Sequence, residues 1–323
     1  MSLDDGDSLR LSDKFAFFRG YNTDKSAGRR DVPLSDLVTL LFPVSQTTDG
    51  YTSGGLVPAD SNVIDKFSFG TANDATDFGN LSVARGYPCG QSSSTDGYSS
   101  GGVSSNVIDK FSFGTANDAT DFGDLTVARY QPAGQSSSTD GYSAGGFAGA
   151  SSNVIDKFSF GTANDATDFG DLTVARYSLA GQSSSTDGYS SGGLVPAASN
   201  VIDKFSFGTA NDATDFGDLT VARGYPCGQS SSTDGYTSGG NLTSNVIDKF
   251  SFGTSNNSAD FGDLSTGRER SAGQSSSTDG YSSGGYTGVS SNVIDKFSFG
   301  TANDASDFGD LTVARYSLAG QQG

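Results

Sequence analysis

The sequence predicts an all-β protein, a six-bladed β-propeller with four antiparallel strands in each blade. Three observations lead to this fold. One segment recurs six times at nearly constant spacing, each period contains four short strand-like segments, and the period that breaks off at the C-terminus is completed near the N-terminus. Periods of about 40 to 50 residues are typical of solenoids and propellers.

The repeat is nearly verbatim. Its core, Asn-Val-Ile-Asp-Lys-Phe-Ser-Phe-Gly-Thr, is followed by an Asp-Phe-Gly segment, an arginine, a Gly-Gln-Ser segment and a Gly-Gly pair. Successive copies lie 44 to 47 residues apart, counted between their lysines: Lys66, Lys110, Lys157, Lys204, Lys249 and Lys296.

The period between Arg85 and Arg129 illustrates the strands of one blade. We expect them over residues 88–93, 98–101, 106–113 and 120–128. A Ser-Thr-Asp-Gly turn separates the first two, and β-branched and aromatic residues favour the third. Because no segment shows a helical period, the four strands describe a β-meander blade.

The two ends of the chain favour a closed ring over an open array. Residues 319–323 complete a first-strand sequence, and residues 46–55 carry the turn and second strand that should follow it. We therefore expect one blade to take its first strand from the C-terminus and the other three from residues 46–85, which leaves no unpaired edge. The predicted domains are an N-terminal segment, residues 1–45, and a propeller, residues 46–323.

Composition excludes several functions. The chain has 323 residues, 37 acidic and 19 basic side chains, a formal charge of −18 and no His. Such a charge disfavours binding to nucleic acid or to anionic membrane surfaces. Without His, Ser-His and Cys-His nucleophile pairs are impossible. The sequence contains no run of eighteen apolar residues, so no membrane insertion is predicted.

The order of a Gly-Gly pair, Ile-Asp-Lys-Phe, Asp-Phe-Gly-Asp-Leu and Arg resembles the Kelch repeat over residues 46–323, with Phe where Kelch repeats usually have Trp. The segments Asp-Lys-Phe-Ser-Phe and Ala-Gly-Gln-Ser-Ser-Ser-Thr are similar to Kelch-like structural proteins of marine bacteriophages, notably cyanophages. The resemblance implies a virion structural or attachment protein of the tail, fibre or capsid, located on the virion or extracellular particle surface. The copper ligands of Kelch-type oxidases have no counterpart in a chain without His.

Variation among the copies distinguishes two faces. The turns after the first and third strands are almost invariant, whereas the connections after the second and fourth strands differ in length and sequence. We expect the variable face to present these residues: Tyr87, Tyr130, Phe147, Tyr177, Tyr225, Arg270, Tyr286 and Tyr316. Exposed tyrosines suit stacking on a host-surface glycan or packing on a protein. The alternative is that they cover the blade ends.

The invariant turns offer oxygen ligands of the kind that calcium prefers, at Asp118, Asp121 and Asp124. Their spacing is not that of an EF-hand, and Asp in turns more often binds backbone N–H groups, so we expect no cofactor. The repeated Lys and Arg are predicted to pair with repeated Asp. A three-blade duplication places Cys89 and Cys227 on opposite sides of the ring, where they pack without forming a disulfide.

Residues 1–45 lie outside the repeat and carry apolar side chains, at Phe15, Phe17, Phe18, Leu37, Leu40 and Leu41. We expect this segment to be an anchor that orders on other virion proteins. The alternative is a flap on the propeller.

The functional prediction is a non-enzymatic virion structural or attachment protein that displays a propeller for host-surface or protein–protein binding. The alternative is a carbohydrate-active propeller enzyme, a glycosidase or lyase, that acts on host-surface polysaccharide with carboxylates alone. Against this alternative, the residues that break the repeat, chiefly Asp60, Glu269 and Arg270, form no evident catalytic pair. The sequence makes no prediction of oligomeric state.

Overall fold

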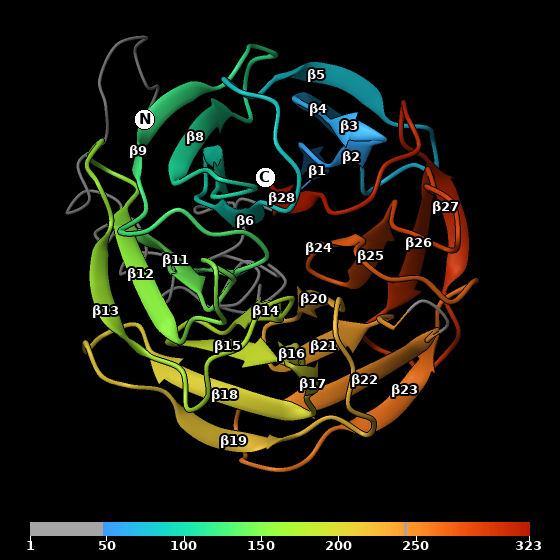
Figure 1. Ribbon diagram of the computed structural model, residues 1–323. Helices are drawn as coiled ribbons and strands as arrows, with labels where there is room; N and C mark the ends of the chain where they lie inside the picture. The colour runs from blue at the N-terminus through green and yellow to red at the C-terminus, as the bar shows by residue number, and fades with distance from the viewer. Residues whose placement is uncertain (1–47, 242–243) are drawn as a thin grey trace, which may run out of the picture. The chain divides into compact units, whose positions relative to one another are not determined.

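A computed structural model describes residues 48–241 and 244–323 of the chain. The anchor candidates Phe15, Phe17, Phe18, Leu37, Leu40 and Leu41 lie outside the described residues. The described residues form six four-stranded antiparallel sheets arranged as blades around an axis, which confirms the six-bladed propeller (Figure 1). No helix in this part of the chain is long and apolar enough to cross a membrane.

The blades are numbered in chain order, and their strands are given from the axis outward. Blade 1 contains β28 (Ala319–Gln322), β1 (Asp49–Ser53), β4 (Val63–Ser68) and β5 (Thr76–Asn80). Blade 2 contains β6 (Cys89–Ser92), β7 (Asp96–Ser100), β8 (Val107–Ser112) and β9 (Thr120–Asp124). Blade 3 contains β10 (Ala133–Ser136), β11 (Asp140–Ala144), β12 (Val154–Ser159) and β13 (Thr167–Asp171).

Blade 4 contains β14 (Ala180–Ser183), β15 (Asp187–Ser191), β18 (Val201–Ser206) and β19 (Thr214–Asp218). Blade 5 contains β20 (Cys227–Ser230), β21 (Asp234–Ser238), β22 (Val246–Ser251) and β23 (Ala259–Asp263). Blade 6 contains β24 (Ala272–Ser275), β25 (Asp279–Ser283), β26 (Val293–Ser298) and β27 (Ser306–Asp310). Two short hairpins follow second strands: β2 (Leu56–Val57) with β3 (Ala59–Asp60), and β16 (Leu194–Val195) with β17 (Ala197–Ala198).

The ring closes within blade 1, as the sequence predicts. The C-terminal strand β28 pairs antiparallel with β1, from Gly50 opposite Gln322 to Ser53 opposite Ala319. Phe67 and Phe69 of blade 1 pack in one cluster with Tyr281 of blade 6. The interface between the last and first blades therefore buries the same repeated residues as the interfaces between consecutive blades.

The core consists of six aromatic clusters between neighbouring blades. Tyr98 of β7 stacks on Phe160 of blade 3, with ring centroids 4.7 Å apart, and its hydroxyl donates to the Phe160 carbonyl oxygen at 3.2 Å. Ile108, Leu125 and Phe158 belong to the same cluster. A few large side chains per interface are enough because the remaining space is taken by backbone and small residues, which explains the low content of apolar residues.

Buried ion pairs join each blade to the next. The arginine that follows an outer strand reaches an aspartate on the third strand of the following blade, as Arg176 does to Asp203 at 2.8 Å, with both side chains fully buried. The same pairing occurs in all six blades: Arg85 with Asp109, Arg129 with Asp156, Arg223 with Asp248, Arg268 with Asp295, and Arg315 with Asp65. The repeated lysines pair with aspartates at the start of second strands, as Lys66 does with Asp49 at 3.0 Å. These pairs confirm the predicted partners.

The fourth strand is shorter than predicted. In blade 2 the strand was expected to continue to residue 128, but β9 ends at Asp124. The chain turns there because Thr126 donates from its backbone and its hydroxyl to Asp156 of the next blade, at 3.0 and 2.7 Å. Arg129 then turns inward to the same carboxylate. Contacts with the neighbouring blade therefore end the strand.

The two cysteines are free and buried, which confirms the packing interpretation. Cys89 lies in blade 2 and Cys227 in blade 5, at the inner strands β6 and β20. Burial raises the pKa of the Cys89 thiol.

Candidate functional site at the axial cavity

The loops that lead from the outer strand of one blade to the inner strand of the next converge on the axis. The second residue after each repeated arginine has a left-handed backbone, with φ between 58 and 63°. We call these six the mouth residues: Tyr87, Gln131, Ser178, Tyr225, Arg270 and Ser317. Such a conformation is uncommon outside glycine, so its recurrence in every blade has a structural cause.

That cause is a closed ring of backbone hydrogen bonds. Gln131 donates its N–H to the Tyr87 carbonyl oxygen at 2.9 Å, and Ser178 donates to Gln131 at 2.9 Å. The pattern continues through every mouth residue until Tyr87 donates to Ser317 at 3.0 Å. Because backbone atoms alone make this ring, the side chains at these positions can differ from blade to blade.

A cavity of about 120 Å³ opens between the mouth residues and extends to the inner strands. Its inner end is a ring of glycines: Gly90, Gly134, Gly181, Gly228, Gly273 and Gly320. A Cβ on Gly134 would overlap the Gly90 carbonyl oxygen, and the same overlap would recur at each of the six. Only glycine fits this close approach of six inner strands.

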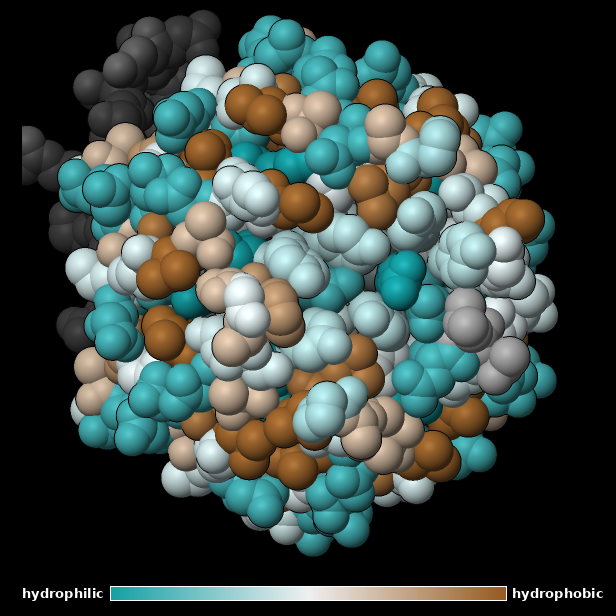
Figure 2. Space-filling model, in the orientation of Figure 1, coloured by the Kyte–Doolittle hydropathy of each residue, from teal (hydrophilic) through white to brown (hydrophobic). Residues whose placement is uncertain are grey.

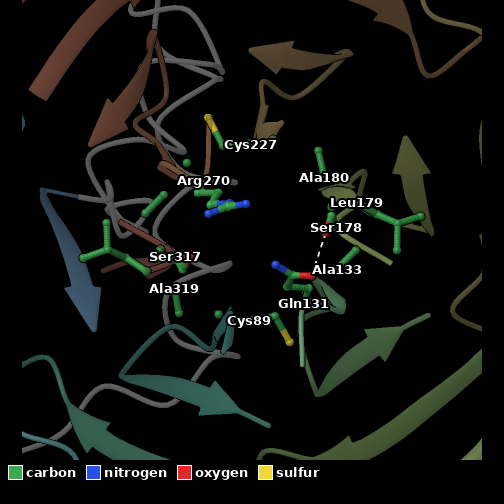
Figure 3. Close-up of a pocket in the computed structure, with 18 of the residues that line it drawn as sticks. Cys89, Gln131, Ala133, Ser178, Leu179, Ala180, Cys227, Arg270, Ser317 and Ala319 are labelled. Carbon is green, nitrogen blue, oxygen red and sulfur yellow. Dashed lines mark hydrogen bonds between the residues drawn. The ribbon is translucent and has the colours of Figure 1, made fainter. Parts of the chain in front are cut away.

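Arg270 projects its guanidinium nitrogens into the open centre of this cavity (Figure 3). Its guanidinium carbon lies 4.3 Å from the centroid of the Tyr225 ring and 6.0 Å from that of Tyr87, within cation–π range. Its Nε lies 3.3 Å from Oε1 of Glu269, a side chain that is almost fully buried. Partial burial opposes its charge, but Tyr87 and Glu269 hold the pKa of Arg270 above its usual value, so it remains a cation.

Aromatic rings continue outward from Arg270 as one contact network. Tyr87 contacts Tyr130, Tyr130 contacts Phe147, and Phe147 contacts Tyr177, with centroids 5.2 to 5.8 Å apart. On another side Arg270 lies 5.9 Å from the Tyr316 ring, which contacts Tyr286 at 5.3 Å. The network unites all eight residues singled out in the sequence: Tyr87, Tyr130, Phe147, Tyr177, Tyr225, Arg270, Tyr286 and Tyr316. All the rings are half-buried and leave an edge or a face to solvent.

The tyrosines of these loops occupy two kinds of position. Tyr87 and Tyr225 are mouth residues. The three others lie one residue nearer the repeated arginine: Tyr130, Tyr177 and Tyr316. These three form backbone bridges with the loop that follows the second strand of the blade they lead into. Burial raises the pKa of Tyr87, although nearby Arg270 opposes the shift.

Three mouth residues that line the cavity were not among the predicted site residues: Gln131, Ser178 and Ser317. The Ser178 hydroxyl donates to Oε1 of Gln131 at 2.8 Å (Figure 3). A count of residues from each repeated arginine would have found them, because all six mouth residues share the same offset.

The calcium candidates take part in bonds between and within blades. Oδ1 of Asp118 accepts the Asn80 N–H at 2.9 Å, across a blade interface, and Oδ1 of Asp121 accepts the Gly123 N–H at 3.2 Å. Over residues 48–241 and 244–323, no three His, Cys, Asp or Glu side chains are grouped to hold a metal ion. The structure thus does not bring Asp118, Asp121 and Asp124 together as ligands.

The acids that break the repeat are engaged separately. Glu269 pairs with Arg270, and Oδ1 of Asp60 accepts the Gly86 N–H at 2.8 Å. Each carboxylate therefore has a local partner of its own.

No protein-family model matches the chain, and no curated protein matches it. The six-bladed ring rests on the repeat and on the structure. The resemblance to Kelch repeats and to phage proteins stays a prediction.

Proposed function

We propose that this protein is a non-enzymatic attachment protein that binds a glycan on the aromatic face around its axial cavity. The observation that carries the proposal is the continuous network of eight side chains centred on Arg270. Tyrosine offers a large, rigid contact area at little cost in conformational entropy, which suits it to the apolar C–H faces of sugar rings. The variable loops that hold these rings surround an otherwise regular scaffold, as in proteins whose loops carry function.

Placement on a virion, with residues 1–45 as the anchor to other virion proteins, belongs to the same proposal and is supported by the sequence resemblance alone. Mass spectrometry of purified particles from the source of the gene tests it. We expect this chain to be present together with virion proteins, and its absence from such particles would contradict the placement.

Replacing Tyr87, Tyr130 and Tyr177 together by Ala tests the aromatic face. Binding to polysaccharide extracted from the host surface should weaken at least about tenfold, because 1.4 kcal/mol is enough for that change and three aromatic contacts are removed. The matched control replaces three exposed valines of the same loops by Ala: Val83, Val127 and Val174. Unchanged attachment of the tyrosine variant, or equal losses in both variants, would contradict glycan binding by this face.

The same polysaccharide distinguishes the enzymatic alternative. A non-enzymatic protein leaves its length distribution unchanged during incubation. Shortened chains whose formation stops on Glu269→Gln would favour a glycosidase or lyase, since such enzymes need a carboxylate pair or an equivalent acid and base.

A further inference from the structure

The axial cavity is large enough to hold part of a ligand. A cavity needs about 10–15 Å³ to hold one water, so a cavity of 120 Å³ has room for roughly ten waters. Its walls are the mouth residues, and its inner end is lined by the ring of glycines. A sugar residue at the end of a chain could enter from the aromatic face and displace these waters.

The cavity has one charge of its own. Among the described residues that line it, Arg270 is the only one with a charged side chain, in a chain whose formal charge is −18. The rest of the lining is uncharged, and Tyr87 and Tyr225 lie on opposite walls, three blades apart. A ligand that enters the mouth of this cavity therefore meets one cation, Arg270, beside the ring of Tyr225.

The guanidinium of Arg270 packs on an aromatic ring and lies beside one carboxylate. Tyr225 covers it at 4.3 Å, and Oε1 of Glu269 lies 3.3 Å from its Nε, within ion-pair distance but without the geometry of a hydrogen bond. The nitrogens drawn in Figure 3 point toward the open centre of the cavity. An arginine whose terminal edge is presented in this way can bind a planar carboxylate with two parallel hydrogen bonds.

Polar groups for sugar hydroxyls lie across the cavity from Arg270. The Gln131 amide accepts the Ser178 hydroxyl through Oε1, and its amide nitrogen is directed toward the open centre (Figure 3). An amide nitrogen donates, and a sugar hydroxyl can accept from it. The side opposite the cation thus complements the hydroxyl groups of a sugar.

From these features we propose that the axial cavity binds the carboxylate of an acidic sugar, a uronic or sialic acid residue, on Arg270. The inference rests on the proposed glycan-binding function and names the ligand class within it. A monoanionic carboxylate is favoured over a dianionic phosphate ester because Glu269 lies beside Arg270, so a second negative charge would be repelled. The carboxylate meets the guanidinium, and the sugar ring then lies toward Gln131 and Ser178 on the other side of the cavity.

Calorimetric titration of the full chain with methyl glucuronide and with methyl glucoside tests the proposal, and N-acetylneuraminic acid is the second acidic probe. We expect at least one acidic sugar to bind about tenfold or more tightly than methyl glucoside, because a charge-assisted pair contributes about 1.5–3 kcal/mol. Arg270→Gln, which copies the residue across the cavity at Gln131, should remove this preference. Because it also takes the cation away from the buried Glu269, we expect a lower melting temperature, and circular dichroism must show the variant folded at the temperature of the titration. Arg270→Lys keeps the charge without the planar fork and should retain part of the preference.

Equal affinity for acidic and neutral sugars in the wild-type protein would overturn the inference, as would a preference for the acidic sugar that survives Arg270→Gln. Failure to bind either acidic sugar would do the same. If the acidic preference is absent but the triple tyrosine variant still loses polysaccharide binding, the carboxylate assignment fails and the glycan-binding function stands. If the triple variant keeps its binding, the proposed function itself fails.

Discussion

The two ends of the axial channel are built by different kinds of hydrogen bond. Beyond the glycine ring, away from the mouth residues, a side-chain oxygen accepts the N–H of the neighbouring blade at 2.9 to 3.0 Å. The six residues of this side-chain ring are Ser92, Ser136, Ser183, Ser230, Ser275 and Gln322. At the mouth residues the corresponding ring uses only backbone N–H and carbonyl groups, at 2.7 to 3.0 Å.

This difference explains why one end is uniform and the other is varied. Where the side chain closes the ring, each blade needs an oxygen acceptor at this position, which is Ser in five blades and Gln322 in the sixth. Where the backbone closes the ring, the side chain is not needed for the hydrogen bonds of the ring, and Tyr, Gln, Ser and Arg all occur. The mouth residues are therefore the positions at which a ligand site could arise without loss of the ring.

Tyrosine shows the same contrast within one residue type. Six tyrosines lie in second strands and are fully buried: Tyr51, Tyr98, Tyr142, Tyr189, Tyr236 and Tyr281. Each donates its hydroxyl to a phenylalanine carbonyl oxygen of the next blade, as Tyr142 does to Phe207 at 3.3 Å. The six others in the described residues surround the cavity and are half-buried: Tyr87, Tyr130, Tyr177, Tyr225, Tyr286 and Tyr316.

The largest expected effect is unfolding of the protein at alkaline pH, caused by ionisation of the six buried tyrosines. Burial, with a smaller contribution from Asp140, raises the pKa of Tyr142 from 10.0 to about 12, and burial likewise raises the pKa of Tyr189 to about 12. A pKa that is higher in the folded state stabilises the fold below pH 10, and this stabilisation is lost as pH rises toward 12. We expect cooperative unfolding in this pH range. Circular dichroism and tyrosinate absorbance, recorded on the same samples, measure it.

The buried tyrosines should ionise only with unfolding. Tyr142→Phe removes one of these ionisations and one hydrogen bond, so it should lower stability at neutral pH by about 1 kcal/mol and weaken the pH dependence above pH 10. Ionisation of all the tyrosines while the strand signal persists would contradict the role of the buried set.

Most of the fold could be predicted because the sequence repeat determines the number of blades and the strands within each blade. The period gives the number of blades, and the split period predicts the pairing of β28 with β1. That each repeated Arg pairs with an Asp follows from the recurrence of both in every blade, but each blade has several Asp residues, so the partner on the third strand could not be named from the sequence. The end of β9 could not be predicted, because it depends on the contact of Thr126 with Asp156 in the next blade.

The candidate site was predictable as a set of residues on one face, but its arrangement was not. Left-handed backbone at residues such as Tyr87 and Gln131 has no signature in residue type, and the bond between them joins positions one period apart. The orientation of Arg270 over Tyr225 likewise depends on how neighbouring blades meet at the axis. These features arise from contacts between blades, whereas the strand pattern is local to each blade.

A matched pair of serine substitutions sharpens the comparison of the two rings. Ser183→Ala removes the oxygen that accepts the Ser136 N–H, so it should lower the free energy of unfolding by about 1 kcal/mol. Ser178→Ala leaves the backbone ring intact and loses only the hydroxyl contact with Gln131, so we expect a loss of about 0.5 kcal/mol or less. Urea denaturation with unchanged slope measures both. A larger loss for Ser178→Ala would contradict the distinction between the rings.

The smallest expected effect is a gain in stability at a mouth residue. Ser317 has a φ of 58°, a conformation that costs a residue with a Cβ about 1–2 kcal/mol and costs glycine little. Ser317→Gly relieves this cost but makes the unfolded chain more flexible, so the net gain should be about 0.5 kcal/mol. Ser183→Gly, in the side-chain ring, is the control and should destabilise the protein because it removes an acceptor. The urea midpoint of each variant, compared with that of the wild type, measures these changes. If both variants lose stability equally, the side chains of the mouth residues stabilise the fold, which would contradict the role given to the backbone ring alone.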